Sequence, residues 1–157
     1  MIYWLYKALA LLPLPLKYCL AWFIAVLLQR VFRYRAQVID TNLKNAFPDR
    51  DAVWRADMTK RFYRQFTDVT MEILHASRMP LVEFKRRVTI EGLEELDRLT
   101  ENRSKSLVVL AIHSGNWEWM MHAANAHGNI QIDPVYKRLR NKGAERFAYE
   151  VRSRFGG

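Results

Sequence analysis

The sequence is short of several features that mark common enzyme classes. It has one cysteine among 157 residues, Cys19, so no internal disulfide can form and the fold needs no oxidising compartment. It has no glycine-rich loop of the G-x-x-x-x-G-K or G-x-G-x-x-G type, which argues against nucleotide binding of those kinds. Ser114 does not stand in a G-x-S-x-G turn, so serine hydrolase chemistry is disfavoured.

Metal ligands are also too few. There is no H-E-x-x-H and no cysteine pair, and Glu118 and His122, four residues apart, fall short of the three or four ligands that zinc needs. We therefore expect no metal and no cofactor.

Acidic residues are outnumbered, with 16 against 25 basic residues and a net charge of +9. Such an excess suits an anionic membrane surface, an acidic carrier protein, a phosphorylated substrate or nucleic acid. The aromatic residues are not interleaved with the basic ones, as they are in many nucleic-acid interfaces. We therefore expect a membrane or acidic partner and no nucleic acid.

The first 35 residues have the character of a membrane anchor. The apolar stretch is divided by Pro13 and Pro15 and is followed by a basic flank made of Arg30, Arg33 and Arg35. Basic residues directly after an apolar helix mark the cytoplasmic side of a membrane. The uninterrupted run 18–28 is too short to span a bilayer alone. We predict anchor helices over residues 1–35, either spanning or lying in one leaflet; the alternative is a helix buried in the protein core.

The remaining chain predicts an α/β fold. Leu107–Ile112 is an apolar, β-branched run typical of a buried strand, flanked by expected strands at 87–90 and 130–135. A long helix is expected to start at Asp49 or Asp51, either of which can cap it, and to end at residue 79, with an apolar stripe from Trp54 to Ile73. Further helices are expected over 81–86, 93–100, 117–127 and 143–154, the last with Phe147 and Val151 facing inward. Strand–helix–strand order predicts an open, mainly parallel sheet flanked by helices, preceded by the membrane-associated helices.

The turn after the expected central strand carries the candidate chemistry. His113 would end the strand and Glu118 would open the next helix, with Asn116 as its cap. Imidazole accepts protons near neutral pH, and a carboxylate folded back onto the ring would fix its tautomer. The free N–H groups of the helix start could also hold an oxyanion. The structural alternative is a buried histidine beside a solvated glutamate, and the spacing alone leaves both open.

The residues themselves narrow this choice. His-Ser-Gly-Asn-Trp-Glu (113–118) resembles the H-x4-D/E motif of glycerolipid acyltransferases, and in particular the H-x-G-N-W-E form of the late acyltransferases of lipid A biosynthesis. Three further segments resemble that family in the same order: Asn42–Pro48, Val135–Asn141 and Arg154–Gly157. Lys137 stands where the family has arginine, and Arg138 where it has proline. The family pattern continues beyond the last residue, so residues 36–157 are expected to be the N-terminal part of an acyltransferase domain.

The resemblance implies a membrane-associated O-acyltransferase at the cytoplasmic face of the bacterial inner membrane. The donor would be an acyl thioester, of acyl carrier protein or of CoA, and the acceptor a hydroxyl of a lipid A precursor or a related lipid. His113 would be the general base and Glu118 its partner, with Asn116, Lys137 and Arg138 on the substrate. Two alternatives stay open: a non-catalytic, membrane-anchored basic lipid-binding fragment, and a thioesterase or lipase in which water replaces the acceptor.

Overall fold

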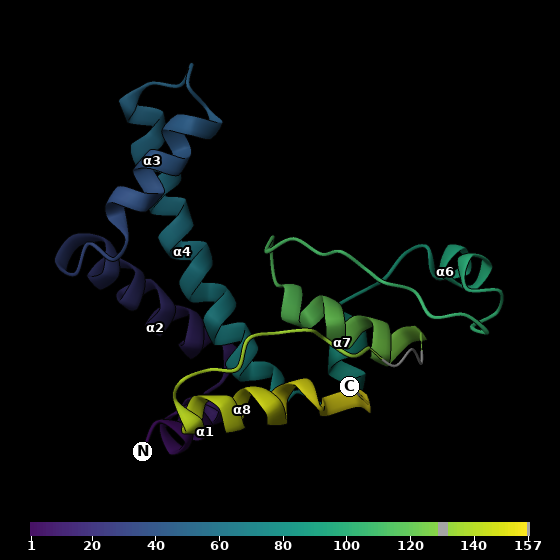
Figure 1. Cartoon of the computed structure of the whole chain (residues 1–157). Helices are drawn as coiled ribbons and strands as arrows, with labels where there is room; N and C mark the ends of the chain where they lie inside the picture. The colour runs from purple at the N-terminus through teal and green to yellow at the C-terminus, as the bar shows by residue number, and fades with distance from the viewer. Residues whose placement is uncertain (129–131, 157) are drawn as a thin grey trace. The chain divides into compact units, whose positions relative to one another are not determined.

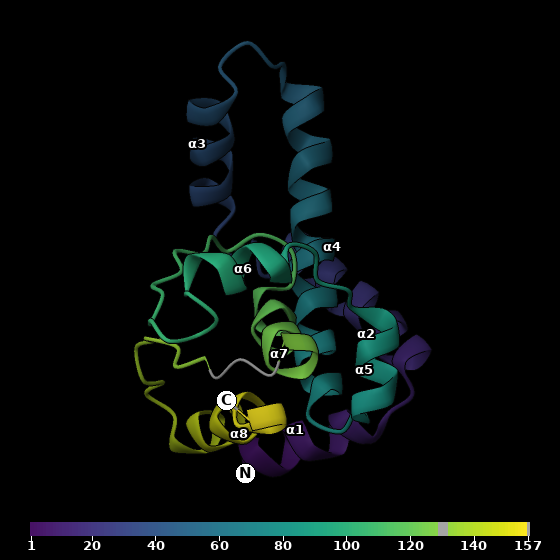
Figure 2. The same cartoon turned by 90° about the vertical axis from the view of Figure 1, so that its right-hand side faces the viewer.

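The computed structural model describes residues 1–128 and 132–156. This part of the chain is helical, with long irregular segments (Figures 1 and 2). Its α-helices are α1 (Ile2–Leu11), α2 (Leu14–Val26), α3 (Ala36–Ala46), α4 (Ala52–Ala76), α5 (Leu81–Arg87), α6 (Leu93–Leu99), α7 (Trp117–Gly128) and α8 (Lys142–Arg152). A π-helical turn, η1 (Leu27–Val31), continues α2, and a 3-10 turn, η2 (Arg154–Gly156), follows α8.

The expected α/β fold with a parallel sheet is wrong, because the described residues contain no strand. The predicted central strand, Leu107–Ile112, is an irregular segment whose side chains are open to solvent; Val108 is 86% and Leu110 95% exposed. The residues of the first expected strand lie partly in α5 and partly in coil. Of the third, 130 and 131 lie outside the described residues and 132–135 are irregular. A strand is stable only when a neighbour pairs with its backbone groups, and the described residues of these segments have no such neighbour.

Two compact units make up the chain. One consists of residues 12–72, and the other of residues 1–11 together with 73–157. These limits differ from the expected division at residue 35. Whether residues 1–35 anchor the protein in a membrane is a separate matter and stays a prediction.

In the unit of residues 12–72, α3 and α4 run side by side as a helical hairpin (Figures 1 and 2). Ala25, Ile39 and Tyr63 form its core, with Leu28 and Leu43 packed against them. Arg33 and Arg35, both in the left-handed region with φ of 48° and 54°, turn the chain from η1 into α3. Asp51 caps α4 as expected: its Oδ1 accepts a hydrogen bond of 2.7 Å from the Trp54 amide.

The stripe predicted along α4 is only partly buried. Val69 is buried, but Phe62 and Phe66 are exposed and stack on each other with ring centroids 6.0 Å apart. The buried face of α4 instead runs through Tyr63, Thr67 and Met71.

The helix Leu14–Val31, formed by α2 and η1, is the one stretch among the described residues that is long and apolar enough to cross a bilayer. Length and composition are the basis of this assignment. Pro13 lies between α1 and α2, so the break predicted at the prolines is confirmed.

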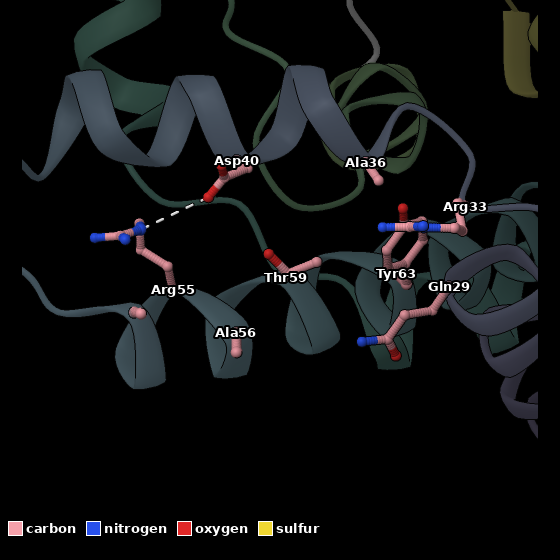
Figure 3. A pocket seen from close by; sticks show the side chains of 9 residues that line it. Gln29, Arg33, Ala36, Asp40, Arg55, Ala56, Thr59 and Tyr63 are labelled. Carbon is pink, nitrogen blue, oxygen red and sulfur yellow. Dashed lines mark ion pairs between the residues drawn. The ribbon is translucent and has the colours of Figure 1, made fainter.

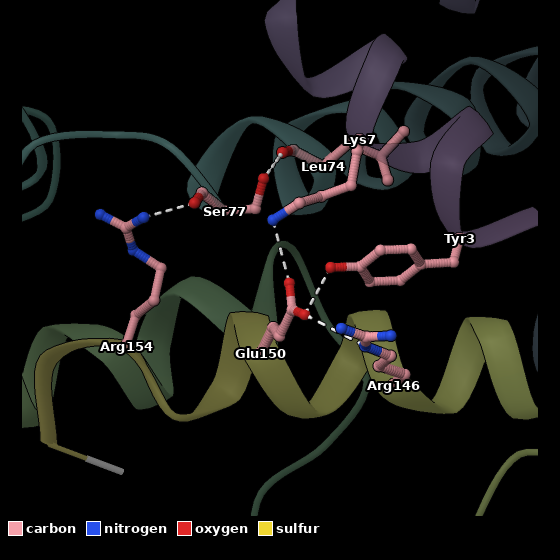
Figure 4. A network of polar contacts seen from close by, with 7 residues as sticks. All are labelled: Tyr3, Lys7, Leu74, Ser77, Arg146, Glu150 and Arg154. Carbon is pink, nitrogen blue, oxygen red and sulfur yellow. Dashed lines mark hydrogen bonds and ion pairs between the residues drawn. The ribbon is translucent and has the colours of Figure 1, made fainter.

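In the other unit, α1 is fastened to α8 by polar contacts (Figure 4). The Glu150 carboxylate accepts hydrogen bonds from the Tyr3 hydroxyl at 2.5 Å and from Lys7 Nζ at 3.0 Å, and Arg146 lies 3.5 Å away. The Tyr3 hydrogen bond, followed by that of Lys7, lowers the pKa of Glu150. The two hydrogen bonds from α1 fix its register along α8, whereas Arg146 belongs to α8 itself.

The apolar core of this unit lies between α5 and α7. Phe84 is fully buried with Met79, Ala123 and Ala126 around it, and Trp119 and Phe155 pack against this cluster. Phe147 and Val151 of α8 are buried, as their spacing predicted. The expected helices near 81–86, 93–100, 117–127 and 143–154 are all present, each within two residues of its predicted ends.

Candidate active site

A tight turn carries the chain from the irregular segment into α7. The Ser114 amide donates to the Ile112 carbonyl at 2.9 Å, and Gly115 follows with a φ of +58°, a conformation that glycine adopts without a Cβ clash. Asn116 then caps the helix, because its Oδ1 accepts a 3.1 Å hydrogen bond from the Trp119 amide. The expected cap is confirmed. Glycine at position 115 and asparagine at position 116 of the motif thus have a conformational reason.

His113 lies at the apex of this turn and is exposed. It does not end a strand, which corrects the expected position. Its ring contacts the Trp117 ring, with centroids 4.7 Å apart and planes at 55°. This indole contact limits the orientations of the imidazole while leaving the ring open to a substrate.

Glu118, in the first turn of α7, is buried and paired with Arg152 of α8. Arg152 Nε donates to Oε2 at 3.0 Å and Nη2 donates to Oε1 at 2.5 Å, a bidentate arrangement. The alternative of a buried histidine and a solvated glutamate is therefore wrong on both counts. In the described part of the chain, no hydrogen bond joins His113 to Glu118.

Arg152 also contacts the segment that follows residue 131. Its guanidinium carbon lies 4.3 Å from the centroid of the Tyr136 ring. The hydrogen bond to Glu118 is the main cause that raises the pKa of Arg152, so its charge is retained. One arginine therefore links the Glu118 carboxylate to Tyr136, a residue of the second family-like segment.

Glu145 holds the same segment against α8. It accepts hydrogen bonds from the Leu139 amide at 2.8 Å and from the Tyr136 hydroxyl at 3.0 Å. The bond from the Leu139 amide is the main cause that lowers the pKa of Glu145. Between these two attachments lie Lys137 and Arg138, which are exposed. Among the described residues, their side chains make no hydrogen bond or ion pair to His113 or Glu118, so their expected role on the substrate stays a prediction.

Asn141 closes the family-like segment by capping α8. Its Oδ1 accepts from the amides of Gly143 and Ala144 at 2.9 and 3.1 Å. The asparagine at this place thus has a structural task, which is to start the helix that carries Arg152.

His122 lies one turn along α7 from Glu118 and is fully buried. Its ring meets those of Phe84 and Phe155 edge to face, at 6.0 and 5.5 Å. Burial lowers the pKa of His122 from 6.5 to about 4; Glu118 opposes this shift, and the charges of Arg154 and Arg152 add to it. The ring is therefore neutral at physiological pH and is part of the core beneath the turn.

Arg154 fastens the end of the chain to the residues after α4. Its guanidinium donates to the Ser77 carbonyl (Figure 4). It also donates to the Met79 carbonyl at 2.8 Å. Phe155, with a φ of 62°, packs on Phe84 with ring centroids 5.3 Å apart. This third family-like segment thus completes the core under α7 and holds α8 in place.

Sequence reasoning missed Arg152 and Tyr136 as members of the site. Arg152 is one of seven basic residues from Lys137 to Arg154, and its neighbours in the sequence do not distinguish it from the others. The sequence contained one signal for each residue. Arg152 lies two residues before the Arg154–Gly157 segment, and Tyr136 directly precedes Lys137. Both lie at the margins of the segments that resemble the family.

The family model for bacterial lipid A biosynthesis acyltransferases matches residues 1–157. No curated protein and no solved structure was found to match the chain.

Proposed function

Because the chain belongs to the bacterial lipid A biosynthesis acyltransferase family, we propose that it moves a fatty acyl chain from a thioester to a hydroxyl of a lipid A precursor. The donor is the thioester of an acyl carrier protein or of CoA. The reaction takes place at the cytoplasmic face of the bacterial inner membrane. The observation that supports this most strongly is the turn at 112–116, which presents an exposed imidazole in front of a helix whose first carboxylate is fixed by an arginine.

In this proposal His113 accepts the proton of the attacking hydroxyl. The acceptor oxygen forms a bond to the thioester carbon, the carbon–sulfur bond breaks, and the proton passes from the imidazolium to the leaving thiolate. No acyl-enzyme and no cofactor is needed. A general base of this kind contributes about 10²–10⁴-fold to the rate.

Glu118 and Arg152 act behind the base. The buried carboxylate offsets the positive charge that His113 acquires, and Arg152 fixes that carboxylate in one orientation. The Trp119 amide is bonded to the Asn116 side chain, and the amides of Trp117 and Glu118 before it, which have no carbonyl partners within the helix, favour the negative charge that develops on the thioester oxygen. Lys137 and Arg138 are exposed beside Tyr136, where they suit the phosphates of the acceptor or an acidic carrier surface.

The pairing of Glu118 with Arg152 also favours a second candidate, a membrane-anchored lipid-binding protein without catalysis. In that case the ion pair is structural and His113 has no carboxylate partner. The net charge of +9 and the apolar helix Leu14–Val31 would serve binding to an anionic membrane.

One assay separates these functions. The purified protein is incubated with an acyl carrier thioester and a lipid A precursor, and both the acylated lipid and the free thiol are quantified. Acyl transfer yields the two products in equal amounts. Thiol without acylated lipid indicates a thioesterase, and lipid binding with neither product indicates the non-catalytic candidate and overturns the proposal.

A further inference from the structure

A pocket of about 290 Å³ opens in the unit of residues 12–72, which contains no residue of the candidate active site (Figure 3). It lies between α3 and α4 and is bounded by the residues that follow α2. Its polar lining consists of Gln29, Arg33, Asp40, Arg55, Thr59 and Tyr63, and alanines form the rest. Its volume is near the lower limit of ligand pockets, about 300 Å³, and suits a headgroup rather than a whole lipid.

The two ends of the pocket differ in chemistry. Arg33 lies at one end and Arg55 at the other, with Thr59 between them (Figure 3). At the second end Arg55 Nε is 3.6 Å from Asp40 Oδ1. This Nε is buried and makes no hydrogen bond, while Nη1 of Arg55 donates to the Arg50 carbonyl at 2.6 Å.

The first end has a net positive charge, because Arg33 faces no carboxylate among the residues that line the pocket. The Tyr63 hydroxyl beside it is turned to the Tyr34 carbonyl, to which it donates at 2.6 Å. A guanidinium with free donors at the mouth of a pocket is suited to bind a phosphate. At the second end Asp40 Oδ2 is already paired with Lys44 Nζ at 2.7 Å, so Asp40 Oδ1 and the Arg55 guanidinium supply an acceptor beside a donor, which suits hydroxyl groups.

The order of these pocket groups along the chain matches the order of the groups in a membrane lipid. The apolar helix ends at Val31, two residues before Arg33, and α3 then leads from Arg33 toward Asp40. An apolar surface, a cationic group and a donor–acceptor pair therefore follow one another in that order. Acyl chains, phosphate and headgroup polyol have the same order in a glycerophospholipid.

We propose that this pocket binds the headgroup of an anionic glycerophospholipid with a polyol headgroup. Arg33 binds the phosphate, Asp40, Arg55 and Thr59 bind the headgroup hydroxyls, and the acyl chains lie along α2. Such a site orients the unit on its membrane by specific recognition in addition to diffuse charge. It is independent of the proposed acyl transfer, because none of its residues belongs to that site.

The test measures binding of the full chain to vesicles of phosphatidylcholine alone and of phosphatidylcholine with phosphatidylglycerol. The wild-type protein should prefer the second kind. Two variants should reduce that preference roughly fivefold or more, on the scale of one basic group at a membrane surface: Arg33→Gln removes the phosphate ligand, and Ala56→Leu fills the pocket without a change of charge. Arg61→Gln, which removes an exposed arginine of α4 outside the pocket, should have little effect.

Circular dichroism of each variant measures whether it folds. If one of the two pocket variants does not fold, the other still tests the pocket. The pocket is overturned if Ala56→Leu binds like the wild type, or if Arg61→Gln loses as much as Arg33→Gln, since both results indicate diffuse attraction. Soluble glycerol phosphate is the third arm. Weak or no competition at millimolar concentration supports a lipid in the bilayer, whereas full displacement indicates a site for free phosphate esters and overturns the lipid assignment.

Discussion

The carboxylate of Glu118 is held by the guanidinium of Arg152, 34 residues further along the chain. The pair connects the start of α7 with the end of α8, and Tyr136 packs on the same guanidinium. Two segments that resemble the family in sequence, 113–118 and 135–141, therefore meet at Arg152, which stands two residues before a third. The pair is mostly buried, with side-chain exposures of 10% for Glu118 and 22% for Arg152, so solvent screens it only in part.

The first prediction concerns this pair. Arg152→Met leaves the Glu118 carboxylate buried without a partner, and we expect a loss of about 3 kcal/mol in the free energy of unfolding. Adding Glu118→Gln to this variant removes the stranded charge, so the double variant should recover part of that loss. Urea unfolding of the single and double variants measures both effects.

The control for this prediction is Lys142→Met, which removes one positive charge from the exposed start of α8. It should change the unfolding free energy by well under 1 kcal/mol. If Arg152→Met is as mild as this control, the pair contributes little to the fold and its role in fixing Glu118 is not supported.

The sequence predicted the helices well because their signals are local. Asp51 and Asn116 cap helices through side chains that lie within three residues of the amides they accept from. Such short-range hydrogen bonds need no knowledge of the rest of the fold. The same holds for Phe147 and Val151, whose spacing on one helix predicted their burial.

The predicted sheet was wrong because an apolar, β-branched run favours the strand conformation but does not show which segment would pair with it. Leu107–Ile112 fits a pleated, buried surface, but pairing depends on a second strand that residues 87–90 and 132–135 do not provide in this structure. The Glu118–Arg152 pair was equally invisible, since its members are far apart in the chain. The motif identified His113 and Glu118; the arginine that binds Glu118 could be found only in three dimensions.

The second prediction concerns the base. His113→Ala should lower acyl transfer by about 10²–10⁴-fold, because the hydroxyl then loses its proton acceptor. Stability should hardly change, since the ring is exposed. Ser114→Ala is the matched control next to it and should stay within a fewfold of the wild type. Transfer by His113→Ala at a comparable rate would remove the histidine from the mechanism.

The third prediction concerns the anchor. Deleting residues 1–29 would also remove Tyr3 and Lys7 from the α1–α8 contact, so a substitution gives a cleaner test. Trp22 and Phe23 are 57% and 54% exposed on α2. Replacing both with serine should lower the partition coefficient into vesicles by roughly tenfold or more, given the free energy of burying such side chains.

The control for the anchor is the double variant Val53→Ser and Val82→Ser, which removes exposed apolar groups from α4 and α5. It should partition like the wild type. Equal partitioning of all three proteins would show that the membrane contact does not run through α2.

The last prediction concerns the buried ring of His122. Its pKa is about 4 in the folded protein and 6.5 when the chain is unfolded. Above pH 6.5 the ring is neutral in both states and contributes no pH dependence. Between pH 6.5 and about 4 the unfolded chain takes up a proton that the folded protein does not, so the free energy of unfolding falls as the pH is lowered. At pH 5 this loss amounts to roughly 2 kcal/mol relative to pH 7.5.

His122→Gln lacks the titrating group. Between pH 7.5 and pH 5 its free energy of unfolding should therefore fall by about 2 kcal/mol less than that of the wild type, because the carboxylates titrate in both proteins. Urea unfolding at the two pH values measures the difference, and NMR of the imidazole carbons provides a direct control. A ring that titrates near pH 6.5 in the folded protein, or equal losses in the two proteins, would show that His122 is not shielded by Phe84 and Phe155 as the structure has it.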